Sequence, residues 1–232
     1  MDPMPTVSLA PDAIEPVIGW RAWALARSPS GEPELRPIVY SGETWPARHV
    51  AEARCPPHGR AGHRPPEAEC TCGLYAVDGL GRLPAVIGRD VTVVGSVAMW
   101  GRLLEHDAGF RAEFAYPQDL RLVCGRCWED GSFAPDVVGM APTSRGTLVG
   151  LCVKHARGES TGRKPGDLQR ELLSAYAVDP VSDGTIERIA AAWSHPDRRP
   201  REGRRRLARD LALTALFFGL YLCVVAAAVW LR

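Results

Sequence analysis

The chain has 232 residues, of which 46% are hydrophobic, so it can bury the core of one large domain or two small ones. The formal net charge of +1 is unevenly spread: residues 198–209 carry +6 and residues 210–232 carry zero, which leaves −5 on residues 1–197. A nucleic-acid-binding domain normally presents a basic face, so this acidic body argues against a nucleic-acid partner.

The N-terminal segment, residues 1–16, is acidic and interrupted by prolines, so we expect it to be disordered and not to act as a signal peptide. The stretches "GWRAWAL" at 19–25 and "PIVYSG" at 37–42 are strand candidates. They open a β-rich, zinc-stabilised domain that we expect to span residues 17–160.

Residues 55–73 read "CPPHGRAGHRPPEAECTCG" and hold three cysteines, two histidines, four prolines and three glycines. This composition excludes a helix and leaves few apolar side chains to bury, so hydrophobic packing cannot hold the segment in shape. One residue separates Cys70 from Cys72, which brings their sulfurs together, and Cys55 can return to them from upstream. We therefore expect a bound metal to hold this loop in shape.

The fourth ligand of this loop is either His58 or His63. The two prolines after Cys55 stiffen the chain before His58, which favours His63. The loop is thus predicted to bind one structural zinc ion, and the alternative is a solvated loop with free thiols. The predicted ligands are Cys55, His63, Cys70 and Cys72. The form of residues 63–76 also resembles a pattern seen in uncharacterised bacterial proteins.

A β-hairpin is predicted next in the chain. Residues 91–101 are rich in β-branched and aromatic residues, and "HDAG" at 106–109 is typical of a hairpin turn. Residues 110–116 alternate with a period of two, which places Arg111 and Glu113 on the face opposite the aromatic residues.

A second group of cysteines follows the hairpin. Cys124-x-x-Cys127 and, 24 residues later, Cys152-x-x-His155 each follow a short apolar run that is a candidate strand. A strand that delivers two ligands in a tight turn is typical of a zinc knuckle. Over residues 120–155 this arrangement resembles the zinc-ribbon and treble-clef families, although the gap is long for a small finger. The resemblance implies one structural zinc on all four residues; a redox-active dithiol is the alternative.

Two helices are expected in residues 161–196. Asp167 can cap a helix over 168–176, and Thr185 can cap a second helix whose apolar residues share one face. Pro196 then breaks the chain before an Arg-rich linker at 197–210.

From Leu211 to Leu231 the chain runs 21 residues without a charge, enough for a helix of about 31 Å, the thickness of a bilayer core. We therefore predict a single transmembrane helix at 211–231, with a buried core helix as the alternative. Arginines precede this segment and only Arg232 follows it. The positive-inside rule then predicts a protein that is tail-anchored in the cell inner membrane, with its N-terminal domain in the cytoplasm.

The predicted fold class is mainly β with a short C-terminal helical part (α+β), a zinc-stabilised β domain followed by a single transmembrane helix. In the reducing cytoplasm, the six cysteines outside that helix are expected to bind metal and not to form disulfides. No Gly-rich phosphate loop, G-x-S-x-G or H-E-x-x-H motif occurs, and no catalytic residue is predicted.

We expect a membrane-tethered, cytoplasmic zinc-binding interaction or scaffold module that holds two structural zinc ions. Its expected partners are the membrane and a protein or small ligand. Two alternatives stay open: a metal-dependent enzyme that uses the Cys/His cluster at 55–72, and a membrane-acting effector with a soluble sensor domain. Closed four-ligand sites favour the module, whereas a site with a bound water favours the enzyme.

Overall fold

A computed structural model describes residues 15–38, 45–55, 62–86, 88, 90–157 and 164–194. Within them, ten strands form one sheet, and three α-helices and one 3₁₀ helix accompany it. The strands are β1 (Val17–Arg27), β2 (Pro33–Pro37), β3 (Ala51–Glu52), β4 (Leu74–Val77), β5 (Val91–His106), β6 (Gly109–Pro117), β7 (Asp119–Leu122), β8 (Gly139–Pro142), β9 (Thr147–Leu151) and β10 (Asp179–Pro180). The helices are η1 (Leu80–Ala85), α1 (Gly125–Glu129), α2 (Pro165–Tyr176) and α3 (Asp183–Ser194).

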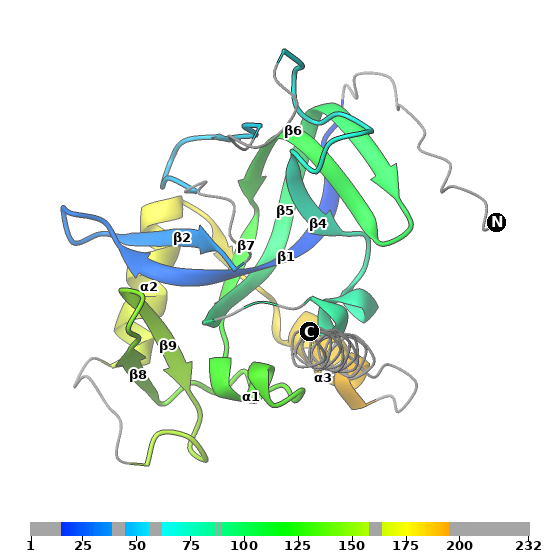
Figure 1. The fold of residues 1–232 in the computed structure, drawn as a ribbon. Helices are drawn as coiled ribbons and strands as arrows, with labels where there is room; N and C mark the ends of the chain where they lie inside the picture. Colours follow the sequence, from blue (N-terminus) through cyan, green and yellow to red (C-terminus); the bar gives the residue numbers. More distant parts are fainter. Residues whose placement is uncertain are drawn as a thin grey trace, which may run out of the picture. The chain divides into compact units, whose positions relative to one another are not determined.

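The centre of the sheet closes into a ring (Figure 1). Strand β1 pairs with β5 on one edge and with β4 on the other, and β6 joins β5 to β4; all four pairings are antiparallel. The remaining strands extend this ring: the β8–β9 hairpin continues from the end of β1, and β7 lies beside β5. The strand β4, which precedes the β5–β6 hairpin in the chain, and the strand β7, which follows it, are therefore both attached to this hairpin.

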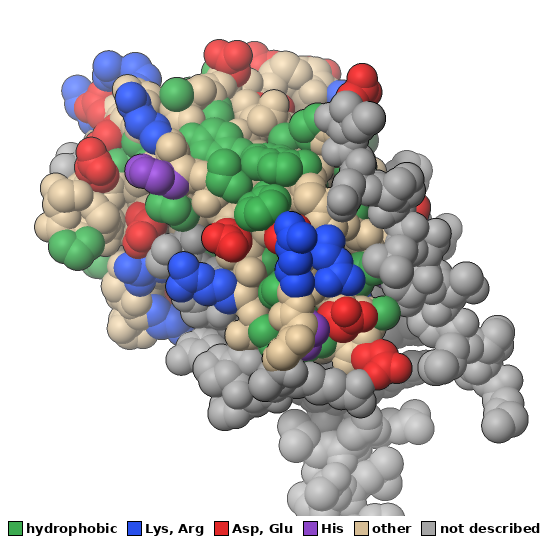
Figure 2. Space-filling view, turned by 90° about the horizontal axis from the view of Figure 1, so that it is seen from above, with side chains coloured by type: hydrophobic (Ala, Val, Ile, Leu, Met, Phe, Trp, Pro, Cys, Tyr) green, Lys and Arg blue, Asp and Glu red, His purple; other side chains and the backbone are tan. Residues whose placement is uncertain are grey.

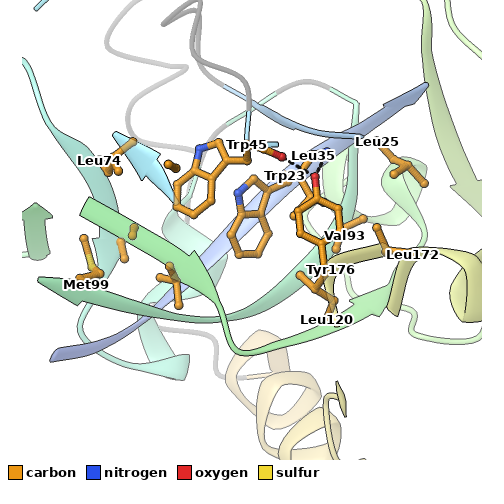
Figure 3. Packing of buried hydrophobic residues seen from close by; sticks show 14 of the residues in the cluster. Trp23, Leu25, Leu35, Trp45, Leu74, Val93, Met99, Leu120, Leu172 and Tyr176 are labelled. Carbon is orange, nitrogen blue, oxygen red and sulfur yellow. Dashed lines mark hydrogen bonds between the residues drawn. The ribbon is translucent and has the colours of Figure 1, made fainter. Parts of the chain in front are cut away.

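Strand β1 separates two apolar cores, so residues 22–26 are buried on both faces. In the larger core, the rings of Trp23 and Trp45 pack edge to face with centroids 5.4 Å apart. Tyr176, the last residue of α2, enters this core; its hydroxyl donates to the Trp45 carbonyl and accepts the Leu35 amide proton at 2.8 Å (Figure 3). The smaller core is covered by α3, whose Ile189 is fully buried.

A bulge interrupts the β5–β6 pairing between Trp100 and Leu103. Gly101 lies there with φ of +76°, a conformation that L side chains rarely adopt. A Cβ atom on Gly101 would also lie 2.9 Å from the Glu113 carboxylate. The bulge therefore brings the backbone of β5 against Glu113, which matters for the loop described below.

The strand predicted at 19–25 lies in β1, and the hairpin predicted at 91–116 is formed by β5 and β6. The predicted strand at 37–42 overlaps β2 only at Pro37, and residues 39–44 lie outside the described part. Both predicted helix caps were wrong. Helix α2 begins at Pro165, a residue suited to the first turn, and Ser182 caps α3, its hydroxyl accepting the Thr185 amide proton at 3.3 Å.

The predicted fold class needs correction. The protein is mainly β with a few helices, but no helix in the described part of the chain is long and apolar enough to cross a membrane. The two longest of these helices, α2 and α3, have 12 residues each, about 18 Å against a bilayer core of about 30 Å. The segments predicted as disordered terminus (1–14 of it), Arg-rich linker and transmembrane helix lie outside the described residues.

Candidate metal centres

Four predicted ligands from the second half of the chain come together in what we call the knuckle cluster: Cys124, Cys127, Cys152 and His155. Strand β7 leads to Cys124 at the start of α1, and Cys127 lies within that short helix. Strand β9 leads to Cys152, whose carbonyl accepts the amide protons of His155 and Ala156 at 2.9 and 2.8 Å in a helical turn. Two strands thus deliver two ligand pairs to one place.

Four donor–donor distances in the knuckle cluster match the edges of a zinc tetrahedron. With Zn–S near 2.3 Å and Zn–N near 2.05 Å, the edges of such a tetrahedron are about 3.8 Å for S–S and about 3.6 Å for S–N. The Sγ atoms of Cys127 and Cys152 are 3.7 Å apart. The three sulfurs lie 3.4, 3.4 and 3.5 Å from Nδ1 of His155. An S–S bond of about 2.05 Å would be far shorter than the 3.7 Å separation.

The second ring nitrogen of His155 also has a partner. Its Nε2 lies 3.5 Å from Oδ2 of Asp130, the residue at the C-terminal end of α1. A carboxylate behind a metal-binding histidine holds the ring in one orientation and one tautomer, with the proton on the nitrogen that does not bind metal. Asp130 lies outside the predicted ligand set, and no spacing motif pointed to it.

Hydrogen bonds from the backbone separate the pKa values of two thiols of the knuckle cluster, Cys127 and Cys152. All three cysteines are buried. Burial and the neighbouring Cys152 raise the pKa of Cys127 to about 12. Burial also acts to raise the pKa of Cys152, but the backbone N–H groups of His155 and Lys154 and the neighbouring thiols bring it down to about 7. In the metal-free cluster, Cys152 therefore becomes the thiolate that metals bind at a lower pH than Cys127 does.

The other four predicted ligands form what we call the loop cluster: Cys55, His63, Cys70 and Cys72. Their donor atoms, like those of the knuckle cluster, all lie within 4.8 Å of one another. The Sγ atoms of Cys55 and Cys70 are 3.7 Å apart, and Nε2 of His63 is 3.2 Å from Sγ of Cys72. His58, the alternative ligand, lies outside the described residues.

The loop cluster is more open to solvent than the knuckle cluster. Only Cys72 is buried, whereas the other three residues are half-buried. The backbone N–H of Cys72 lowers the pKa of Cys70 to about 7, while desolvation and the neighbouring Cys70 raise the pKa of Cys55 to about 11. In each cluster one thiol pKa is thus lowered, that of Cys152 or Cys70, while that of a neighbouring thiol, Cys127 or Cys55, is raised.

Two charged residues of β6 hold the loop and were missed by sequence reasoning. Arg111 and Glu113 are both buried, 8% and 5% exposed, and face the loop. Arg111 donates to loop carbonyls, and Glu113 pairs with Arg64, the residue after His63. The strict alternation of residues 110–116 was visible, but it did not reveal that the charged face is covered. The expectation that only a metal would hold the loop was therefore wrong, because side chains of β6 also hold it.

Comparison with known protein families, with characterised proteins and with solved structures found no match. The residues themselves therefore carry the interpretation. Three thiols and one imidazole supply the sulfur and nitrogen donors that Zn²⁺ prefers in four-coordinate sites. Within each of the two Cys/His clusters the donor atoms are close enough together to bind one metal ion, which suggests two zinc-binding segments.

Proposed function

We propose that each cluster holds one structural zinc ion and that the zinc-stabilised β domain is an interaction module for a protein or small-ligand partner. The observation that carries the zinc assignment is the tetrahedral spacing of four donor atoms in the knuckle cluster. The loop cluster has the same donor set, and its Cys55–Cys70 separation of 3.7 Å fits the same geometry.

A structural role is favoured over a catalytic one by the number of protein donors. Catalytic zinc sites usually have three protein ligands and keep a water in the fourth position. Each cluster here offers four donors within 4.8 Å of one another, which would fill a tetrahedron. This supports an interaction module over a metal-dependent enzyme at the loop cluster.

The order of elements around the knuckle cluster supports the treble-clef interpretation. A knuckle at residues 124–127 is followed by the β8–β9 hairpin and then by a helical turn that carries the second ligand pair. The knuckle and the hairpin also touch through a bridge between Cys124 and Gly150. A metal in this position would join β7 to β9.

Surface composition supports the interaction role. Val153, which lies between two ligands of the knuckle cluster, is 68% exposed, and Val138 before β8 is 49% exposed. Figure 2 shows a further gathering of apolar side chains on one face, flanked by acidic and basic ones. Exposed apolar groups rimmed by charge are typical of surfaces that bind partners.

Metal analysis combined with X-ray absorption at the zinc edge tests the proposal. We expect about two zinc ions per chain and an average first shell of three sulfurs and one nitrogen. Cys124→Ser and Cys70→Ser should each remove one zinc and leave the other. A solvent oxygen among the zinc ligands at either centre would favour the metal-dependent enzyme. Fewer than two zinc ions per chain would show that one of the two clusters does not bind zinc.

A further inference from the structure

Arg111 makes an unusual set of contacts with the loop cluster. Its side chain reaches from β6 to the turn that carries Cys70 and Cys72, and the two N–H groups of one nitrogen, Nη1, are shared among three backbone carbonyls there. The acceptors are the oxygens of Glu67 at 3.2 Å, of Cys72 at 3.2 Å and of Cys70. A single buried guanidinium thus fixes the backbone on both sides of the two cysteines.

The sheet determines that Arg111 lies at this turn. Strand β4 begins two residues after Cys72 and pairs with β6, with Tyr75 opposite Arg111. The guanidinium carbon lies 5.8 Å from the centre of the Tyr75 ring, and the Tyr75 hydroxyl donates to the Thr71 carbonyl at 2.7 Å. Gly73 has φ of +123°, and a Cβ there would lie 3.1 Å from Cβ of Arg111. A side chain at Gly73 would be strained at this φ and crowded against Arg111, so glycine suits the turn.

Glu113 anchors the other end of the loop. Its carboxylate pairs with Arg64 next to His63 and accepts the Arg102 amide proton at 3.2 Å at the β5 bulge. Nη1 of Arg102 in turn donates to the Arg64 carbonyl at 2.8 Å. The backbone next to His63 and the backbone around Cys70 and Cys72 are therefore both held by side chains of the β5–β6 hairpin.

The charge of Arg111 also suits a metal centre. Three thiolates and one neutral imidazole around Zn²⁺ leave a net charge of about −1. At the loop cluster, Arg111 lies against Cys72, and its positive charge offsets this surplus. At the knuckle cluster, the neighbouring charged group on the histidine is the carboxylate of Asp130. Two clusters of the same residue types thus differ in their neighbours: an arginine lies against a cysteine of one, and a carboxylate lies against the histidine of the other.

We propose that Arg111 is the positioning residue of the loop centre. It holds the turn over residues 67–72 so that the thiols of Cys70 and Cys72 are in place before a metal binds, and its charge offsets that of the filled site. The proposal rests on the proposed function to the extent that the loop cluster binds zinc. It differs from a general stabilising role because only one of the two centres should depend on Arg111.

The test uses the full chain and measures zinc affinity by competition with a chromophoric chelator, after wild-type stoichiometry has been determined. Loss of an outer contact to a metal ligand typically costs about 10–100-fold in affinity. We expect a loss of this size at one of two sites in Arg111→Lys, which keeps the charge but not the planar fork, and a larger loss in Arg111→Gln. Arg121→Gln is the matched control. Arg121 lies on strand β7, and its ion pair is with the exposed side chain of Asp183.

Co²⁺ substitution and hydrogen exchange identify which site changes. The weakened site should be the one whose Co²⁺–thiolate absorption is also lost in Cys70→Ser, while the site lost in Cys124→Ser serves as an internal reference. In the metal-free chain, amide exchange over residues 62–75 should be faster in Arg111→Lys than in wild type. Faster exchange in the metal-free variant would show that Arg111 orders the loop before metal binds. A contact that Arg111 made only in the zinc-loaded site would leave exchange in the metal-free chain unchanged.

Each outcome decides the matter. Unchanged loop affinity in Arg111→Lys, or equal weakening of both centres, overturns the proposal; equal weakening would show that Arg111 supports the whole fold. If Arg111→Gln does not fold, Arg111→Lys alone decides by the same criteria. A wild-type chain that binds only the knuckle zinc overturns the proposed function first and the role of Arg111 with it, a result distinct from failure in the variants.

Discussion

At the scale of single residues, the two histidines present different nitrogens to their clusters. His155 faces the sulfurs with Nδ1 and His63 with Nε2. In His155 the remaining nitrogen points to Asp130, so the carboxylate selects the form of the ring that can bind metal. The surroundings of the ligands, and not the ligands alone, therefore distinguish the two centres.

Asp130→Asn should weaken zinc binding at the knuckle cluster by about 10-fold and leave the loop cluster unchanged, because an amide holds the imidazole less firmly than a carboxylate does. Chelator competition would measure both affinities. Asp136→Asn is the matched control, since Asp136 is exposed on the same segment. Equal affinities in Asp130→Asn and wild type would contradict a role for the carboxylate.

At the scale of elements, the larger core depends on how α2 is attached to the sheet. The Tyr176 hydroxyl joins the carbonyl of Trp45 to the amide of Leu35, while the carbonyl of Tyr176 accepts the Tyr116 hydroxyl proton at 2.6 Å. These residues come from a helix, from β2, from β6 and from the segment after β2. The buried Tyr176 thus links α2 to β2 and to the segment after β2 through its hydroxyl, and to β6 through its backbone carbonyl.

Tyr176→Phe should lower the free energy of unfolding by about 1–3 kcal/mol, because it leaves a buried amide and a buried carbonyl without this partner. Urea denaturation of the zinc-loaded chain at pH 8 measures the loss. A variant as stable as wild type would show that the phenol adds only apolar packing.

Burial raises the pKa of Tyr176, so its contribution depends on pH in a known direction. Below the usual tyrosine pKa of about 10, the phenol is protonated in the folded and the unfolded chain, and its stabilising effect is complete. Above pH 10 the unfolded chain loses the proton first, so stability falls as pH rises. The stability gap between wild type and Tyr176→Phe should therefore narrow between pH 9 and pH 11; a constant gap would contradict the buried phenol.

The two clusters should differ in how far their elements loosen without metal. Cys124→Ser should speed hydrogen exchange across the β8–β9 hairpin and residues 152–156, because the knuckle cluster joins that hairpin to α1. Cys70→Ser should loosen residues 62–73 less, because Arg111 and Glu113 still hold this loop. Faster exchange in the loop of Cys70→Ser than in the hairpin of Cys124→Ser would contradict this order.

At the scale of the whole molecule, the residues of the two large apolar cores are distinct from the metal-binding cysteines. The larger core is built around Trp23, Trp45 and Tyr176, and the three cysteines of the knuckle cluster form a separate group. A small zinc finger lacks such a core and unfolds without metal. This domain should instead keep its sheet when the metal is removed.

Chelation of both zinc ions should therefore lower the melting temperature while the far-UV and the near-UV tryptophan circular dichroism at 20 °C stay close to those of the loaded chain. The physical reason is that the tryptophan pair packs in the larger core, which is built from the sheet and α2 and contains none of the metal-binding cysteines. Complete loss of the near-UV signal on chelation would show that metal binding and folding are one event.

The sequence by itself determined what depends on neighbouring residues. The pairs Cys124/Cys127 and Cys70/Cys72 can meet within a single turn because only one or two residues separate them, and the alternation after Gly109 predicted β6. Only the tertiary structure decided which distant pair each local pair meets, because Cys152 reaches Cys127 where β9, paired with β1, passes Cys124 at the bridge to Gly150. It also turned Arg111 and Glu113 inward. Alternation marks two faces of a strand, but which face is covered depends on where the loop before β4 lies, and that position is determined by contacts between strands far apart in the chain.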